Sequence, residues 1–181
     1  MKTLEKLKLH NLGEIGVAEQ KAMRGGRSLD PVNGSCTNLI GEVTVYGGTL
    51  GMVQNAIGEL GVTEYSGSAN NPRIQEYFGS CNGLGSNTPD SIAWCGSFAN
   101  YIVEKSGYEG TGSAMASSWY NWGSPTSNPQ PGDIAISPDG HHVGVVTSVT
   151  NGVITIISGN YGNQVAESVC TGYSFRRAPE N

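Results

Sequence analysis

The feature that most constrains this 181-residue chain is an apolar helix with a cysteine at its start. Residues 90–100 read DSIAWCGSFAN, and apolar residues continue at helical spacing through Ile102. We expect Asp90 or Ser91 to cap this helix, which places Cys95 near its N-terminus. Free backbone N–H groups and the positive end of the helix dipole favour a thiolate there. The segment therefore predicts a nucleophilic cysteine that needs an imidazole from elsewhere in the chain.

The C-terminal third has the composition of strands separated by short turns. A Pro-Asp-Gly turn before His141 and the Asn151-Gly152 turn predict that three of these strands form consecutive hairpins. The whole set predicts an antiparallel meander in which the two adjacent histidines begin the second strand. The predicted strands cover residues 133–137, 142–149, 153–158, 164–168 and 173–176.

Only one of His141 and His142 can face the helix, because neighbouring strand residues point to opposite faces of a sheet. The hairpin loop decides which of them shares a face with Asn160. A two-residue Asn-Gly loop places Asn160 opposite Val143, on the face of His141. A three-residue Thr-Asn-Gly loop with a bulge places Asn160 directly opposite His142. Both loops suit the sequence.

The order of Cys95, His142 and Asn160, with the residues around them, resembles the CHAP-like cell-wall hydrolases of bacteria and phages. These are papain-like cysteine, histidine-dependent amidohydrolases and peptidases. The likeness covers most of residues 50–177. Its motifs are a Trp-Cys helix, a Pro-Gly-Asp turn and a His-Val-Gly strand, here at residues 94–95, 131–133 and 142–144.

This resemblance implies an α+β, papain-like fold. N-terminal helices, with the nucleophile at a helix N-terminus, would pack on a C-terminal antiparallel sheet of about five strands. By the same likeness Cys95 is the nucleophile, His142 the general base and acid, and Asn160 the group that orients the imidazole. Many relatives carry a glutamate two residues before the asparagine, where this chain has Ser158. The first oxyanion donor would be the backbone N–H of Cys95.

Other residues near these motifs have two interpretations. Trp94, Trp119 and Trp122 are candidates for lining a substrate groove, and packing in a small core is equally expected. Asp133 is expected to fix the turn into its strand. The two adjacent histidines do not predict a zinc site, since their side chains diverge across the strand. We expect no metal and no cofactor.

The N-terminal segment LGEIGVAEQKAMRGG, residues 12–26, resembles a double-glycine export leader. Such leaders place apolar and acidic residues at fixed distances before a terminal Gly-Gly, here Ile15, Glu19 and Met23. The resemblance implies cleavage after Gly26, at the Gly25-Gly26 pair, by a bacterial ABC exporter with its own cysteine peptidase domain. The alternative is an ordinary helix that ends at a glycine C-cap.

These features divide the chain into a leader at 1–26, a linker at 27–49 and a CHAP-like hydrolase domain at 50–181. Residues 27–181 hold five Lys/Arg against twelve Asp/Glu, so no binding to nucleic acid through a basic patch is expected. We expect no membrane insertion, because no apolar stretch is long enough. A continuous apolar core of the kind found in general secretory signals is also missing from residues 1–26.

The chain has four cysteines. If Cys95 is the nucleophile, at most one disulfide forms among Cys36, Cys81 and Cys170. The sequence does not choose the pair.

Taken together, the sequence predicts a secreted bacterial peptidoglycan hydrolase with a Cys-His-Asn thiol mechanism. It would cleave either the N-acetylmuramoyl-L-alanine amide or a bond of the peptide stem. The export leader favours an antibacterial toxin, which would have an immunity protein as a partner. Two alternatives stay open: a cysteine protease that acts on protein substrates, and a non-catalytic cell-wall binding module.

Overall fold

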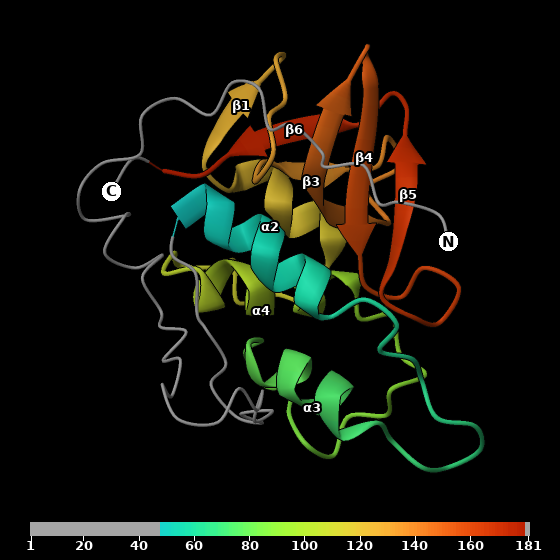
Figure 1. Ribbon diagram of the computed structural model, residues 1–181. Coiled ribbons are helices and arrows are strands. Elements are labelled where there is room, and N and C mark those ends of the chain that lie inside the picture. Colours follow the sequence, from blue (N-terminus) through green and yellow to red (C-terminus); the bar gives the residue numbers. More distant parts are fainter. Residues whose placement is uncertain (1–47, 180–181) are drawn as a thin grey trace, which may run out of the picture. The chain divides into compact units, whose positions relative to one another are not determined.

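The computed structural model describes residues 48–179, which belong to a unit that spans Val45–Asn181 (Figure 1). Its helices come first: α2 (Gly48–Gly58), α3 (Pro72–Gly79), α4 (Cys95–Lys105) and the 3-10 helix η1 (Ala116–Asn121). Its strands follow: β1 (Ser124–Thr126), β2 (Ile134–Ile136), β3 (Val143–Thr150), β4 (Val153–Ser158), β5 (Ala166–Cys170) and β6 (Ser174–Arg177). Helices followed by an antiparallel sheet confirm the predicted α+β class.

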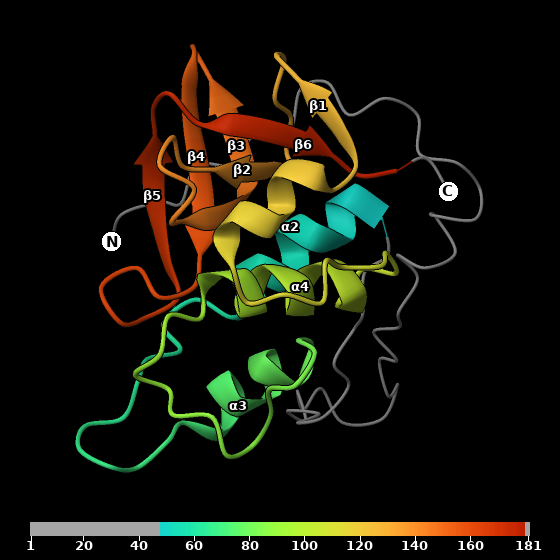
Figure 2. The ribbon, with the colours of Figure 1, turned by 180° about the vertical axis from the view of Figure 1, so that it is seen from behind.

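The sheet has six antiparallel strands in the order β1-β6-β2-β3-β4-β5. Strands β2 to β5 form the predicted meander. Strand β6 does not continue it, but returns across the sheet to lie between β1 and β2 (Figure 2). The expectation of a simple meander of about five strands was therefore incomplete. The missed strand, β1, has only three residues, one of them Pro125, which is typical of a short edge strand.

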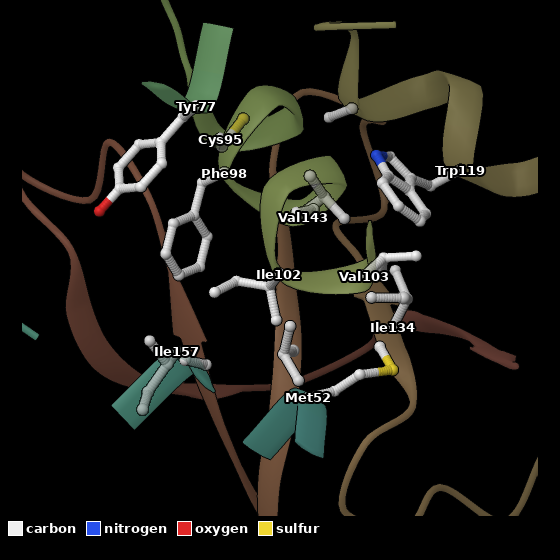
Figure 3. Close-up of a cluster of buried hydrophobic side chains, with 14 of the residues drawn as sticks. Met52, Tyr77, Cys95, Phe98, Ile102, Val103, Trp119, Ile134, Val143 and Ile157 are labelled. Carbon is white, nitrogen blue, oxygen red and sulfur yellow. The ribbon is translucent and has the colours of Figure 1, made fainter. Parts of the chain in front are cut away.

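The main core lies between the helices and one face of the sheet. Helix α4 packs against α2, α3 and β3, and α2 also packs against β3 (Figure 1). Figure 3 shows Met52 of α2, Ile102 of α4 and Val143 of β3 among the side chains of this cluster. Each large apolar side chain buried in this way contributes about 1.5–3 kcal/mol to folding. The fully buried residues of this core include Phe98, Val103, Ile134, Val145 and Ile157.

The opposite face of the sheet carries a second, smaller apolar cluster. Ala135, Val146, Ile156 and Cys170 are buried there. The alternation of Val145 on one face and Val146 on the other follows from the two-residue period of a strand. Strand β3 is thus buried on both faces at the end that begins beside the histidines.

The ends of the chain lie largely outside the described residues. The leader prediction, with Gly25 and Gly26, concerns residues outside this range. Helix α2 begins at Gly48, just before the predicted start of the domain at residue 50. Among residues 48–179, no helix is both long and apolar enough to cross a membrane.

Candidate active site

Cys95 is the first residue of α4. Trp94 holds the N-cap position, and no side chain caps the helix. The predicted caps, Asp90 or Ser91, were both wrong. The Asp90 carboxylate instead accepts hydrogen bonds from the backbone N–H groups of Tyr65 and Asn71, at 3.0 and 2.8 Å. Because no side chain competes for them, the first N–H groups of α4 are available to the cysteine sulfur and to a substrate.

The start of α4 is closely covered by the segment that precedes η1. A Cβ atom at Gly96 would lie 2.2 Å from the carbonyl oxygen of Ala114, so only glycine permits this approach. The Cys95 side chain is buried, with 4% of its surface exposed. Burial raises the pKa of the Cys95 thiol, and nearby backbone N–H groups oppose this only in part. The resting sulfur is therefore a thiol, whereas the helix-terminus argument from the sequence favoured a thiolate.

The Cys95 sulfur lies against the backbone on both sides of His142. Its S–H donates to the carbonyl oxygen of His141, with 3.7 Å between sulfur and oxygen, and the N–H of Val143 donates to the sulfur. Within residues 48–179, no hydrogen bond joins the sulfur to the His142 ring. The sulfur thus touches the backbone around His142 and forms no resting ion pair with the imidazole. In enzymes without substrate, such catalytic contacts are often longer than in the complex.

His142 directly precedes β3 and is held by its own backbone. Its N–H donates to Ser137 Oγ at 2.8 Å, and its carbonyl accepts from the Ser137 N–H at 2.9 Å. Ser137 Oγ in turn donates to Asp139 Oδ1 at 2.5 Å. Burial lowers the pKa of His142, and the charge of Asp139 opposes this shift. The imidazole is therefore neutral near pH 7, which is the form that can accept a proton.

The hairpin between β3 and β4 combines the two predicted alternatives. Thr150 pairs with Val153, so the loop has two residues. A β-bulge between Val146 and Ser148 then shifts the register by one residue. Continued past the last pair, the shifted register brings residue 160 level with residue 142 rather than with residue 143. The bulge therefore places Asn160 opposite His142, an arrangement that was expected only from the three-residue loop.

Among residues 48–179, however, no hydrogen bond joins Asn160 to the imidazole of His142. Strand β4 ends at Ser158, and Asn160 has a left-handed backbone with φ of 55°. The residue that bonds the ring is Ser158, whose Oγ lies 2.8 Å from Nε2 of His142. Sequence reasoning did not assign Ser158 a role. The signal that pointed to it was the replacement of the usual glutamate at that position.

The three tryptophans are core residues. Trp94 and Trp119 are fully buried, and Trp122 is 7% exposed. The indole N–H of Trp94 donates to Glu64 at 2.9 Å, and that of Trp122 donates to the carbonyl oxygen of Glu109 at 2.8 Å. Their burial favours packing over the substrate contact that was one of the two expectations.

Two large side chains near the predicted site are exposed, in contrast to the buried tryptophans. Tyr161 is about half exposed, and its ring centroid lies 6.0 Å from that of His142. Met115 is 67% exposed, and its backbone lies against Gly96 at the start of α4. These two side chains are thus exposed beside His142 and the start of α4, whereas the tryptophans are buried.

A cavity of about 430 Å³ lies nearby on the β1–β6 side of the sheet. Its lining includes Tyr120 and Tyr173 but not Cys95 or His142. Tyr120 donates its hydroxyl to the carbonyl oxygen of Ser137 at 2.8 Å, which connects the cavity wall to the segment that holds His142.

His141 and Asp133 lie near the predicted site residues in sequence, and within residues 48–179 neither side chain forms a hydrogen bond with the Cys95 sulfur or the His142 ring. The His141 side chain is exposed. Asp133 accepts from the Gln130 N–H at 2.8 Å and forms an ion pair with Arg177 at 2.8 Å, which fixes the turn before β2. Among the described residues, no group of three or more His, Cys, Asp or Glu side chains is placed to hold a metal ion.

Two of the remaining cysteines, Cys81 and Cys170, lie in different parts of the described fold. Cys81 and Cys170 are free, buried thiols, so these two do not pair. Cys81 contacts Ser97 Oγ at 3.3 Å, whereas Cys170 belongs to the cluster on the other face of the sheet. Cys36 lies outside the described residues.

The site thus combines a buried thiol at a helix start with a partly buried histidine whose flanking backbone lies against the sulfur. Residues 87–160 match the model of the CHAP domain family, in agreement with the resemblance drawn from the sequence. The match contains Cys95, His142 and Asn160. It supports a function of the peptidoglycan-hydrolase type.

Two further comparisons complete the picture. The comparison with curated proteins found no match. Among solved structures, the chain is similar to a mutated form of the Resuscitation Promoting Factor Interacting protein RipA, with 21% sequence identity and a TM-score of 0.45. The similarity covers 71% of this chain and 61% of that one, less than two thirds of its length.

Proposed function

We propose that this protein hydrolyses an amide bond of peptidoglycan, with Cys95 as nucleophile and His142 as general base and acid. The observation that carries the proposal is the position of the Cys95 sulfur at the uncapped start of α4, against the backbone on both sides of His142. The lowered pKa of the partly buried His142 imidazole adds to it, because a general base must be unprotonated when the reaction begins.

In the proposed reaction, Nδ1 or Nε2 of His142 takes the thiol proton as Cys95 Sγ attacks the amide carbonyl carbon. The tetrahedral oxyanion accepts a hydrogen bond from the backbone N–H of Cys95. The C–N bond then breaks, and the imidazolium gives its proton to the leaving amine. Water, deprotonated by His142, attacks the thioester, and the sulfur leaves and regains its proton. The products are one amine and one carboxylic acid.

The bond cut is either the amide between muramic acid and L-alanine or one within the peptide stem or cross-bridge. Mass spectrometry of fragments released from purified peptidoglycan by the full chain decides between them. A free lactyl carboxylate on muramic acid identifies an amidase, and a new amine within the stem identifies an endopeptidase. A peptide library incubated in parallel tests the protease alternative. Cleavage of the library with intact peptidoglycan would replace the proposal by a protein-directed protease.

A non-catalytic wall-binding module is the remaining alternative. The slight exposure of Cys95 and the missing contact between its sulfur and the imidazole are the observations that favour it. Co-sedimentation with peptidoglycan separates the two functions. Binding by the wild type without any release of fragments, under reducing conditions, would support the module and contradict the enzyme.

We also propose export through the double-glycine leader, with removal of residues 1–26 at Gly25-Gly26. An extracellular wall hydrolase exported in this way suits an antibacterial toxin, with an ABC exporter and an immunity protein as partners. The intact mass of the protein in the culture medium of its host tests the leader. An N-terminus at Arg27 supports it, and full-length protein retained in cells contradicts both the leader and the toxin role.

A further inference from the structure

We propose that Ser158, not Asn160, positions the imidazole of His142. The inference rests on the proposed function for its catalytic meaning. Ser158 Oγ lies 2.8 Å from Nε2 of His142, and no hydrogen bond connects Asn160 to that ring among residues 48–179. Ser158 acts through His142 and not on the substrate, so it is a positioning residue.

The Ser158 hydroxyl is held rigidly. Ser158 is the last residue of β4, pairs with Ala166 of β5 and is fully buried. On its other side, Gly144 of β3 leaves it room: a Cβ atom there would lie 2.9 Å from the Cβ of Ser158. Strand pairing and burial leave this side chain little freedom, which is what a group that orients an imidazole requires.

Asn160 lies beyond the end of this pairing. The residue before it, Gly159, approaches the helix so closely that a Cβ atom would lie 2.5 Å from the Trp94 ring and 2.6 Å from Phe98. The chain then enters the left-handed conformation at Asn160, which asparagine tolerates better than most residues. These two features are those of a turn that leaves the sheet.

The serine has a chemical consequence for the proton. If Nε2–H donates to Ser158 Oγ, the lone pair is on Nδ1, which is then the atom that takes the Cys95 proton. A hydroxyl is neutral, so it orients the ring without stabilising the imidazolium as a carboxylate does. The titratable groups that act on the ring or pack beside it are Asp139 of the loop before β3 and Tyr161 after β4, while the Cys95 thiol of α4 lies against the neighbouring backbone. Asp139 is the carboxylate among them; it is exposed and accepts hydrogen bonds from Ser137 Oγ and the His141 N–H.

The test is the protonation state of His142 read by two-dimensional ¹H–¹⁵N NMR of the imidazole in the full chain at pH 7.5. The variants are Ser158→Ala and Asn160→Ala, with Ser168→Ala of β5 as a serine control on the neighbouring strand. In the wild type, Nε2 should carry the proton. Ser158→Ala should raise the ratio of the Nδ1–H to the Nε2–H form about fivefold, the equivalent of one hydrogen bond. Asn160→Ala and Ser168→Ala should leave this ratio unchanged.

The NMR result stands apart from catalysis, since it needs no substrate. A changed ratio in Ser158→Ala supports the inference even if the wild type cleaves no peptidoglycan, an outcome that would sink the proposed function alone. A changed ratio in Asn160→Ala with none in Ser158→Ala overturns the inference. With an active enzyme, Ser158→Ala should lower kcat about tenfold with an unchanged KM, because orientation and not binding is lost. A higher KM at unchanged kcat would contradict a positioning role.

Discussion

The two halves of the candidate site are held in place by different forces. Cys95 starts a helix whose inner residues, such as Phe98 and Ile102, are fully buried in the main core. His142 is the last residue of the loop before β3 and is held by hydrogen bonds to Ser137 and Ser158. Apolar packing thus places the nucleophile, and a few polar contacts place the base. The difference implies that changes in the helix half reduce stability first, whereas changes in the strand half reduce activity first.

The largest effect is expected from Phe98→Ala in the helix half. The fully buried ring packs edge-to-face on Tyr77 at 5.4 Å, and its loss leaves a cavity. We expect the free energy of unfolding to fall by about 3–5 kcal/mol, measured by urea denaturation. Val169→Ala, at a side chain that is 65% exposed, is the control and should change it by less than about 0.5 kcal/mol. Equal losses in the two variants would contradict a core that is centred on α4.

Gly159→Ala tests the seam between the two halves of the site, which is the close contact of Gly159 with Trp94 and Phe98. The new methyl group would lie within 2.6 Å of Trp94 and Phe98, so the strand end or the helix must shift. Overpacking of this kind costs about 1–3 kcal/mol, and the shift should lower activity as well. The control is Gly85→Ala, where a Cβ atom meets nothing within 4 Å. If Gly159→Ala keeps wild-type stability and wild-type activity, the seam does not position the site.

Ser137→Ala acts on the strand half alone. It removes the acceptor for the His142 N–H and the donor to Asp139. We expect kcat/KM to fall about tenfold, while the free energy of unfolding falls by only about 1 kcal/mol. Steady-state kinetics and urea denaturation of the same samples check this, with the exposed Ser91→Ala as control. A large loss of stability without loss of activity would contradict the claim that changes around His142 reduce activity before they reduce stability.

The smallest effect is the dependence of stability on pH. Burial lowers the pKa of His142 below the value of 6.5 that it has when unfolded. As the pH falls through 6.5, the unfolded state binds the proton first, so the free energy of unfolding decreases until the pH is below the folded pKa. His142→Gln should flatten this decrease, and His141→Gln, at an exposed side chain, should not. Urea denaturation between pH 8 and 5 compares the three proteins; identical slopes would show that His142 is not buried as neutral.

The same contrast explains what the sequence could predict. The α4 helix and the hairpin turns are local signals, carried by apolar spacing around Cys95 and by the Asn151-Gly152 pair, and both were predicted correctly. The bulge at Thr147 has no local signal, since this residue resembles its strand neighbours in composition. The register shift at this bulge decides which residues after β4 lie opposite His142. The sequence alone therefore could not choose between the two-residue and the three-residue loop.

Polar contacts between residues distant in sequence could not be predicted from the sequence either. Asp90 precedes a helix and suits a cap, but its carboxylate is taken by backbone N–H groups of Tyr65 and Asn71, distant in sequence. Ser158 reads as an ordinary strand residue until the fold brings it to His142. Burial of the tryptophans, likewise, depends on how α4 and η1 pack and not on their own spacing.

The most direct test of the central claim is the rate at which new amine termini appear in purified peptidoglycan treated with the full chain under reducing conditions. The series comprises the wild type, Cys95→Ala, His142→Ala and His141→Ala. We predict a loss of at least about 10⁴-fold in the first two variants and a near wild-type rate in His141→Ala. Wild-type rates in Cys95→Ala, or equal losses in the two histidine variants, would contradict a thiol hydrolase built on Cys95 and His142.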